Sequence, residues 1–265
     1  MTVLCRVLEV TTGGFYAWCG RGESTRAHQN RRLTVETVAA FNQFDGCYGS
    51  PRLHRELGAG RHRVARIMRE QGLAARPRRR FCVTTDSRHG DAVAPNHLGR
   101  NFVSPQPNRI WAGDVTYLPT WEGWLYLAVL LDLHSRRVVG WALSERNDDS
   151  LTMAALQMAL DQRQPEPGLL HHSDRGSTYT SGRYLDLLDK HQITPSMSRR
   201  GNCWDNAVSE SFFSTLDAEC SKHQPFRSRA EARRKVPAYI LGFYNPTRLH
   251  SYLGYMSPMD FERAA

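Results

Sequence analysis

Three acidic residues, Asp114, Asp174 and Glu210, have the side chains best suited to metal-ion chemistry. Asp114 lies in an apolar, strand-like stretch, IWAGDVTYLPT at residues 110–120, on the same face as Ala112. Because an uncompensated carboxylate is costly to bury, Asp114 requires a cation, a metal ion or an open cleft beside it. Carboxylates from several elements can together hold Mg²⁺ or Mn²⁺. Two such ions can activate an attacking hydroxyl and stabilise the leaving oxygen of a phosphodiester. Alternatively, the three residues are ordinary surface carboxylates that bind no metal ion.

The segments around these residues predict a mixed five-stranded sheet with flanking helices. Short connections indicate that the first three strands are antiparallel, at residues 110–120, 124–133 and 136–143. A helix at about residues 150–162 permits a right-handed crossover to a parallel strand at residues 169–172. Asp174 then lies at the carboxyl end of that strand, where open α/β sheets bind ligands. A helix, a short strand and a helix that carries Glu210 follow, at residues 184–190, 193–197 and 204–219.

Composition narrows the class of protein. The chain has 265 residues and a formal net charge of +9, which favours polyanionic partners such as nucleic acid. Neither a long apolar run nor an apolar signal core is present, so we expect a soluble cytoplasmic protein without a membrane partner. The six cysteines are scattered singly, which argues against a zinc site and for buried thiols in a reducing compartment.

Residues 1–80 predict a helical region. A helix at about residues 26–44 has Leu33, Val35, Val38 and Phe41 as expected core residues. Ser50 is placed to cap a second helix with Pro51 at its first position. A third helix, at residues 61–71, directs Val64, Ile67 and Met68 inward and Arg63, Arg66 and Arg69 outward. Two short helices with an arginine face suggest a helix-turn-helix DNA reader, and a solvated basic helix is the alternative.

The next segment, RPRRR at residues 76–80, is basic and contains proline. It predicts an extended arm along DNA phosphates, through Arg78, Arg79 and Arg80. Residues 81–107 are polar and proline-containing, which predicts a linker.

Longer motifs carry a family resemblance. Between Asp174 and Glu210 lie 35 residues, which resembles the D(35)E arrangement of retroviral integrases and related transposases. The segments WAGDVTY, EGWLYLAVLLDLHSRRVVGWAL, HSDRGSTYTS, SMSRRGNCWDNAVSESFFSTL and YNPTRLHSYLGYMSPMDFE resemble the second-reading-frame (OrfB) transposases of a large bacterial insertion-sequence family. YGSPRLHREL and RVARIMREQGL resemble the N-terminal helical region of that family. The resemblance covers nearly the whole chain.

This resemblance implies an α/β, ribonuclease-H-like catalytic domain at residues 108–222. A helical DNA-binding region at 1–80 and the linker at 81–107 precede it, and a helical extension at 223–265 completes its core. Asp114, Asp174 and Glu210 would be the catalytic residues and would bind two Mg²⁺ or Mn²⁺ ions. The implied reaction is hydrolysis at element ends to free a 3′-OH, which then attacks target DNA.

Fourteen residues are expected to contact DNA. Arg175 and Tyr179 follow Asp174 and suit a phosphate and a base stack. The Tyr244 to His250 motif predicts structural hydrogen bonds near the active face or a DNA contact. His171 and His172 cap a strand end or, alternatively, bind a second metal. The full set of expected DNA contacts is Arg52, Arg63, Arg66, Arg69, Arg78, Arg79, Arg80, Arg175, Tyr179, Arg199, Arg200, Asn202, Lys222 and Arg248.

Two residues depart from the family's usual pattern. Gly113 replaces a threonine, and Asp217 replaces a lysine that would be available to a DNA phosphate. An acidic residue at 217 would repel the DNA backbone, so the contact would come instead from Lys222 or a nearby arginine.

The expected partners are the terminal repeats of the element, the target duplex and further copies of the chain on DNA. The upstream-frame product of the same element, joined by frameshifting, is another, and the expected location is the bacterial nucleoid. A nuclease that cuts without joining and a catalytically idle DNA-binding regulator are the alternatives. The sequence does not specify the repeat sequence, the target preference or the number of subunits.

Overall fold

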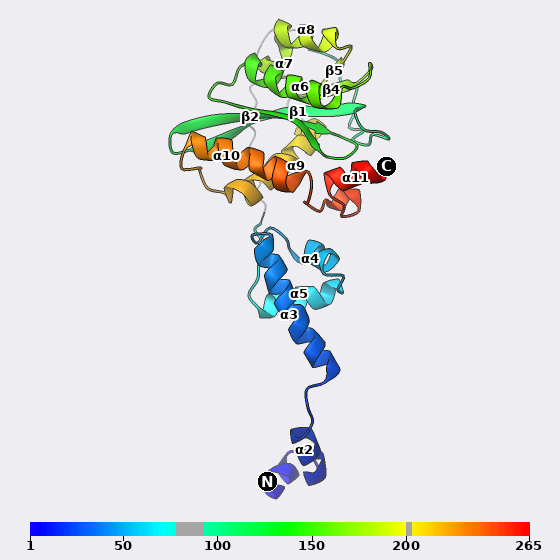
Figure 1. Ribbon diagram of the computed structural model, residues 1–265, viewed down its shortest axis with the longest axis vertical. Coiled ribbons are helices and arrows are strands. Elements are labelled where there is room, and N and C mark those ends of the chain that lie inside the picture. The colour runs from blue at the N-terminus through cyan, green and yellow to red at the C-terminus, as the bar shows by residue number, and fades with distance from the viewer. Residues whose placement is uncertain (78–92, 200–202) are drawn as a thin grey trace. The chain divides into compact units, whose positions relative to one another are not determined.

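A computed structural model describes residues 1–77, 93–199 and 203–265 (Figure 1). The chain divides into two compact units, residues 1–75 and 76–265, and each is described by itself. In the described part of the chain, every helix is too short or too polar to cross a membrane.

The first unit contains five helices in its described length. They are α1 (Thr2–Val7), α2 (Thr12–Cys19), α3 (Thr25–Gln43), α4 (Ser50–Glu56) and α5 (Arg61–Glu70). As predicted, Val64, Ile67 and Met68 of α5 are buried. Gly58 lies between α4 and α5 with a φ of +59°, a left-handed conformation that glycine adopts without strain. The two helices and their tight turn confirm the helix-turn-helix-like arrangement.

Two details of this unit differ from the prediction. Val35 is 66% exposed because α3 packs through Leu33, Thr37 and Ala40, a row at helical spacing that includes a threonine. The N-cap of α4 is Gly49, and Ser50 is already helical and makes no capping hydrogen bond. The Thr37 hydroxyl donates to the Leu33 carbonyl at 2.7 Å, which satisfies it inside the core and explains why a hydropathy pattern misses it.

The second unit is built on the predicted mixed sheet of five strands. These are β1 (Ile110–Thr120), β2 (Gly123–Asp132), β3 (Val138–Ser144), β4 (Leu170–Ser173) and β5 (Thr194–Met197). Their spatial order is β3-β2-β1-β4-β5. β1 is antiparallel to β2, and β2 to β3, whereas β4 is parallel to both β1 and β5. The return to a parallel strand follows the helix after β3, as a crossover requires.

Helices cover both faces of the sheet (Figure 1). One face carries α6 (Asp149–Arg163), α7 (Ser177–Thr180) and α8 (Gly182–Lys190), and the other carries α9 (Ala207–Leu216), α10 (Arg229–Tyr239) and α11 (Pro258–Ala264). A Cβ at Gly140 of β3 would lie 2.3 Å from the carbonyl oxygen of Ala155, so glycine permits the close approach of α6. Leu151, Leu156 and Leu160 of α6 are buried in that layer.

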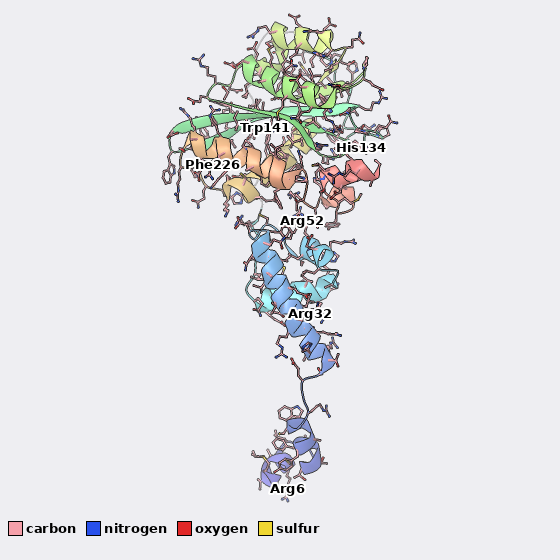
Figure 2. All side chains as sticks on the ribbon, viewed as in Figure 1. Arg6, Arg32, Arg52, His134, Trp141 and Phe226 are labelled. Carbon is pink, nitrogen blue, oxygen red and sulfur yellow. The ribbon has the colours of Figure 1, made fainter. Side chains whose placement is uncertain are left out.

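The extension at residues 223–265 supplies much of the hydrophobic core between the sheet and helices α9 and α10. Phe226, Val236, Ile240 and Tyr244 are buried there with Phe212 and Phe213 of α9, and Trp141 packs against them (Figure 2 labels Phe226 and Trp141). The ring of His134 packs against that of Phe261 in α11, with 5.1 Å between the ring centroids (Figure 2 labels His134).

The C-terminal motif makes structural hydrogen bonds. The Asn245 side chain bonds both the N–H and the carbonyl of Val138 at the start of β3. The Tyr244 hydroxyl donates to the Arg136 carbonyl at 3.1 Å. Arg248, 2% exposed, donates two bonds of 2.7 Å to Glu219, and Tyr239 donates to the same carboxylate. The expectation that Arg248 contacts DNA is therefore wrong, because its guanidinium is buried and held by Glu219.

Part of the expected linker belongs to the second unit. Leu98 is 3% exposed, and the Ser196 hydroxyl of β5 accepts hydrogen bonds from the backbone of His97 and Leu98. Residues 93–107 therefore pack on the sheet rather than spanning between folded parts, while Arg78, Arg79 and Arg80 lie outside the described residues.

We predict that Arg248→Ala lowers the free energy of unfolding by about 3–5 kcal/mol, because it leaves the Glu219 carboxylate buried without its cation. Arg263→Ala is the matched control. Arg263 pairs with Asp260 at the surface, with 69% and 55% of the two side chains exposed, and its loss should cost below about 1 kcal/mol. Urea denaturation measures both, and equal losses would contradict the role given to Arg248.

Candidate active site

The parallel pairing of β1 and β4 brings two of the three predicted carboxylates together. In this register Ile110 pairs with Leu170 and Ala112 with His172. The register ends at this second pair, two residues before Asp114 and Asp174, and the charge of Asp174 raises the pKa of Asp114. Asp174 follows directly after the last residue of β4, where one of its oxygens accepts the N–H of Gly176 at 2.9 Å.

Asp114 is the electrostatic centre of the site. Its residue is 8% exposed, and burial raises the pKa of its carboxyl well above the ordinary value. The negative charges of Asp174 and Glu210 raise this pKa further, and the hydrogen bond from Val115 N–H opposes them. Asp114 thus lies in the field of both other carboxylates, on a strand where a positive ion would relieve the cost of three like charges.

Glu210 comes from the facing helix, α9. Phe212, Phe213 and Leu216 bury the other side of that helix, which fixes its rotation and leaves Glu210 half-buried. Burial also raises the pKa of Glu210. The arrangement therefore brings Asp114, Asp174 and Glu210 into one electrostatic neighbourhood from two strand positions and one helix.

In the described part of the chain, no three His, Cys, Asp or Glu side chains are close enough to form a metal-ligand cluster. The donor set nevertheless suits hard divalent cations, since all three groups are carboxylates. The raised pKa of Asp114 supports the same fit, because a bound cation would favour the ionised form that burial disfavours.

Asp205 anchors the approach to α9. No side chain caps α9. The buried Asp205 carboxylate instead accepts hydrogen bonds from the backbone and guanidinium of Arg199. Arg100 and Asn96 also donate to it. The bonds from Arg199, followed by those from Arg100, hold the pKa of Asp205 well below its usual range.

The two histidines before Asp174 are structural. The hydroxyl of Ser196 donates to His172 Nδ1, and Nε2 donates to the Asp205 carbonyl, each at 3.0 Å. His171 Nε2 is bonded to the Tyr184 hydroxyl. Burial lowers the pKa to about 3 for His171 and to about 4 for His172. Both rings are therefore neutral and engaged in the core, which favours the strand-capping role over metal binding.

Gly113 explains how His171 fits. A Cβ at this position would lie 2.6 Å from His171 Cε1 and 3.4 Å from Tyr179. The glycine that replaces the family's usual threonine leaves the space that the imidazole fills. Tyr179, expected to stack on a base, is 2% exposed and packs edge-on to His171. That expectation is wrong, because the ring is buried against His171 and Tyr184.

Three further expected DNA contacts of this unit, Arg175, Arg199 and Lys222, are among the described residues. Arg175 donates to the Ser198 carbonyl at 2.6 Å. Arg199 keeps 54% of its side chain exposed while paired with Asp205. Lys222 is exposed and has a φ of +58°. Arg200 and Asn202 lie outside the described residues.

Asp217 has local partners that the sequence did not reveal. Its carboxylate accepts hydrogen bonds from Ser221 Oγ and His223 Nδ1, both at 2.6 Å. His223 Nε2 lies 2.8 Å from the carbonyl oxygen of Pro77. The acidic residue therefore organises the end of the Glu210 helix, where the π-helical turn η2 (Asp217–Ser221) begins.

A separate basic groove lies in the first unit. It has a volume of about 680 Å³, and its lining residues are Thr25, Arg26, Gln29, Asn30, His62, Arg63 and Arg66. Arg63 donates to Asn30 at 2.7 Å. Arg66 is exposed next to Glu70, Arg69 is exposed, and Arg52 lies over the Tyr48 ring. The sequence reading missed the contribution of α3, although its polar residues recur at helical spacing.

Known families match both units. The integrase core domain family matches residues 104–203 and, through a second family of that description, residues 191–258. An HTH-like domain family matches residues 28–81.

Two relatives match nearly the whole chain. The chain is 43% identical over 266 residues to the transposase InsF for insertion sequence IS3A of Escherichia coli (strain K12), which covers 98% of this chain and 92% of the relative. It is 41% identical over 263 residues to an uncharacterized 31 kDa protein of insertion element IS600 of Shigella sonnei, with 97% of each covered.

The fold has solved counterparts. A chain in the simian T-cell lymphotropic virus intasome, determined with PP2A regulatory subunit B56 gamma, matches with a TM-score of 0.54 and 16% identity. The match covers 87% of this chain and 74% of the other. This confirms the integrase-like fold.

We predict that Gly113→Ala lowers the free energy of unfolding by about 1–3 kcal/mol, because its methyl group would displace the buried His171 ring. Gly242→Ala serves as the control, since a Cβ there meets nothing within 4 Å. Thermal and urea unfolding measure the two variants. A Gly113→Ala protein as stable as Gly242→Ala would show that the His171 ring can shift without a loss of stability.

Proposed function

Because the chain belongs to the family of bacterial insertion-sequence transposases that carry an integrase core domain, we propose that it cleaves insertion-element ends and joins them to target DNA at the Asp114 site. The single observation that carries this proposal is the buried Asp114 carboxylate, whose pKa is raised by burial and by the charges of Asp174 and Glu210. A buried carboxylate whose ionisation is disfavoured by two neighbouring carboxylates forms a site whose charge favours cations.

Asp114, Asp174 and Glu210 would hold two Mg²⁺ or Mn²⁺ ions. Such ions stabilise the developing charge on phosphodiester oxygens and lower the pKa of a bound hydroxyl. The protein residues would fix the geometry around them: β1 carries Asp114, Asp174 follows the neighbouring parallel strand β4, and the apolar face of α9 orients Glu210. The reaction needs no covalent intermediate on a serine or tyrosine.

Arg199 is suited to hold a DNA phosphate beside this site. The buried Asp205 carboxylate fixes one edge of its guanidinium, while 54% of the side chain stays exposed. Arg175 and Lys222 are further candidates in this unit. A guanidinium that is already oriented loses less conformational entropy when it binds a phosphate.

The groove between α3 and α5 is a candidate for reading DNA. Arg26, Arg63 and Arg66 supply positive charge, and Gln29 and Asn30 carry the amides that pair with adenine edges. Arg52, Arg69 and the basic residues Arg78, Arg79 and Arg80 would add phosphate contacts. We further propose that the chain acts as a homo-oligomer on DNA in the bacterial nucleoid, together with the upstream-frame product of its element.

We predict that Asp114→Asn abolishes metal-dependent end cleavage, with a loss greater than the 10–100-fold that is typical of residues supporting a metal ligand. A gel assay with a labelled element end measures cleavage, and a supplied 3′-OH donor tests joining separately. Cleavage without joined product would identify a nuclease, and full activity of Asp114→Asn would overturn the metal assignment.

The same variant should be more stable than the wild type near neutral pH without metal. A carboxyl whose folded pKa is raised loses stability as the pH rises above its ordinary value of 3.8, and the amide removes this loss. Added Mg²⁺ should stabilise the wild type and have little effect on Asp114→Asn. Asp189→Asn, at an exposed position of α8, is the control that should retain both the pH dependence and the metal response.

We predict that Asp217→Lys strengthens binding to terminal DNA several-fold at low salt, because each added phosphate contact increases affinity and its salt dependence. Asp217→Asn separates the causes, since it weakens the His223 contact without adding a cation. Fluorescence anisotropy at matched ionic strength measures both. Equal affinities for the lysine variant and the wild type would show that position 217 does not face the DNA.

A further inference from the structure

A second cavity lies beside the catalytic helix. Its volume is about 350 Å³, and one wall consists of Ala207, Ser211 and Thr215, which share a face of α9 at a spacing of four residues. Glu210 precedes Ser211 in sequence but is not part of this lining. The cavity therefore shares the α9 helix with Glu210 but does not include it, and its volume falls in the lower part of the range for ligand sites.

A buried arginine lies against this cavity. Arg136 is 5% exposed and sits at the bend before β3 with a φ of +60°. One guanidinium nitrogen, Nη2, donates to the Phe102 carbonyl at 2.9 Å. The other, Nη1, is buried and has no hydrogen-bond partner.

The charge of Arg136 is not balanced by a carboxylate. Among the residues that the structure describes, none forms an ion pair with Arg136, and those that line the cavity include no Asp or Glu. The nearby Asp132 is engaged by the backbone amides of Asn108 and His134. Burial lowers the pKa of Arg136, and Tyr252, Tyr244 and Asp132 offset this only in part. A buried cation with an unused donor is costly unless a ligand supplies an acceptor.

The other walls are aromatic and hydroxylic. The ring of Tyr252 lies over the Arg136 guanidinium, with 4.1 Å between the guanidinium carbon and the ring centroid, and Tyr252 is 51% exposed. Phe102, Phe212 and Tyr244 also contribute rings, and Ser211, Thr215 and Ser251 contribute hydroxyls. This combination suits a flat ring that carries hydrogen-bond acceptors.

We propose that this cavity takes the base of an unpaired nucleotide from the DNA at the active site, with an acceptor atom of the base bonded to Arg136 Nη1. The inference rests on the proposed function, which supplies DNA beside Glu210. Aromatic stacking and arginine contacts are the interactions by which proteins hold unstacked bases. Since every base has a ring face and an acceptor, the site would favour an unpaired nucleotide over a paired one without strict sequence preference.

Photo-crosslinking tests the proposal. Single-stranded oligonucleotides with 5-iododeoxyuridine at one position in turn are irradiated with the full-length chain, and the attached peptide is identified by mass spectrometry. We expect attachment to Tyr252 or Phe102. Ser211→Leu, which fills the α9 wall, should abolish that attachment.

Affinity for single-stranded DNA provides the second measurement. Tyr252→Ala should weaken binding about ten-fold, the scale of one lost base stack. Trp121→Ala is the matched control, because Trp121 is another exposed aromatic residue of the same unit, at 73%, and should leave affinity and crosslinking unchanged.

Crosslinks only outside the cavity, together with unchanged affinity of Ser211→Leu and Tyr252→Ala, would overturn this inference while leaving wild-type cleavage and joining intact. A wild-type chain that neither binds nor cleaves DNA would overturn the proposed function as well.

Discussion

The parallel pairing of β1 with β4 is the constraint on which the rest of the site depends. It brings the end of β4, which Asp174 follows, alongside β1, where the Asp114 carboxylate is buried and its pKa is raised by burial and by the charge of Asp174. The connection from β3 to β4 through α6 returns the chain for parallel pairing, and Gly140 leaves room for α6 close to β3. The catalytic geometry thus begins with a backbone register rather than with the side chains themselves.

Buried ion pairs then fix the elements that surround this register. Asp205 binds Arg199, Arg100 and Asn96, which ties the segment before β1 to the start of the Glu210 helix. The buried pair of Glu219 and Arg248 links the turn that follows the same helix to the C-terminal motif. Such pairs contribute little net stability when compared with apolar packing. Their breakage is expensive, however, so they specify one position for the helix that carries Glu210.

The layer beneath Asp114 shows how one small residue sets the packing of its neighbours. Gly113 leaves room for His171, which is neutral and bonded to Tyr184, and Tyr179 packs against that imidazole. The floor of the site is therefore apolar and neutral. Arg175 and Arg199 follow the ends of β4 and β5, where Arg175 bonds the Ser198 carbonyl and Arg199 pairs with Asp205.

The sequence by itself determined the strands, the crossover and the helix-turn-helix-like pair, and its motifs predicted the three carboxylates. Alternating apolar residues, turn residues and motif spacing are local properties, and they persist whatever the distant chain does. Tertiary structure alone decided which polar side chains are buried. Arg248 and Tyr179 resemble surface DNA contacts in sequence, yet Glu219 and His171 hold them inside. Asp217 departs from the family pattern in sequence, yet its carboxylate is hydrogen-bonded to His223 in the structure. Burial and pairing depend on residues that only folding brings together.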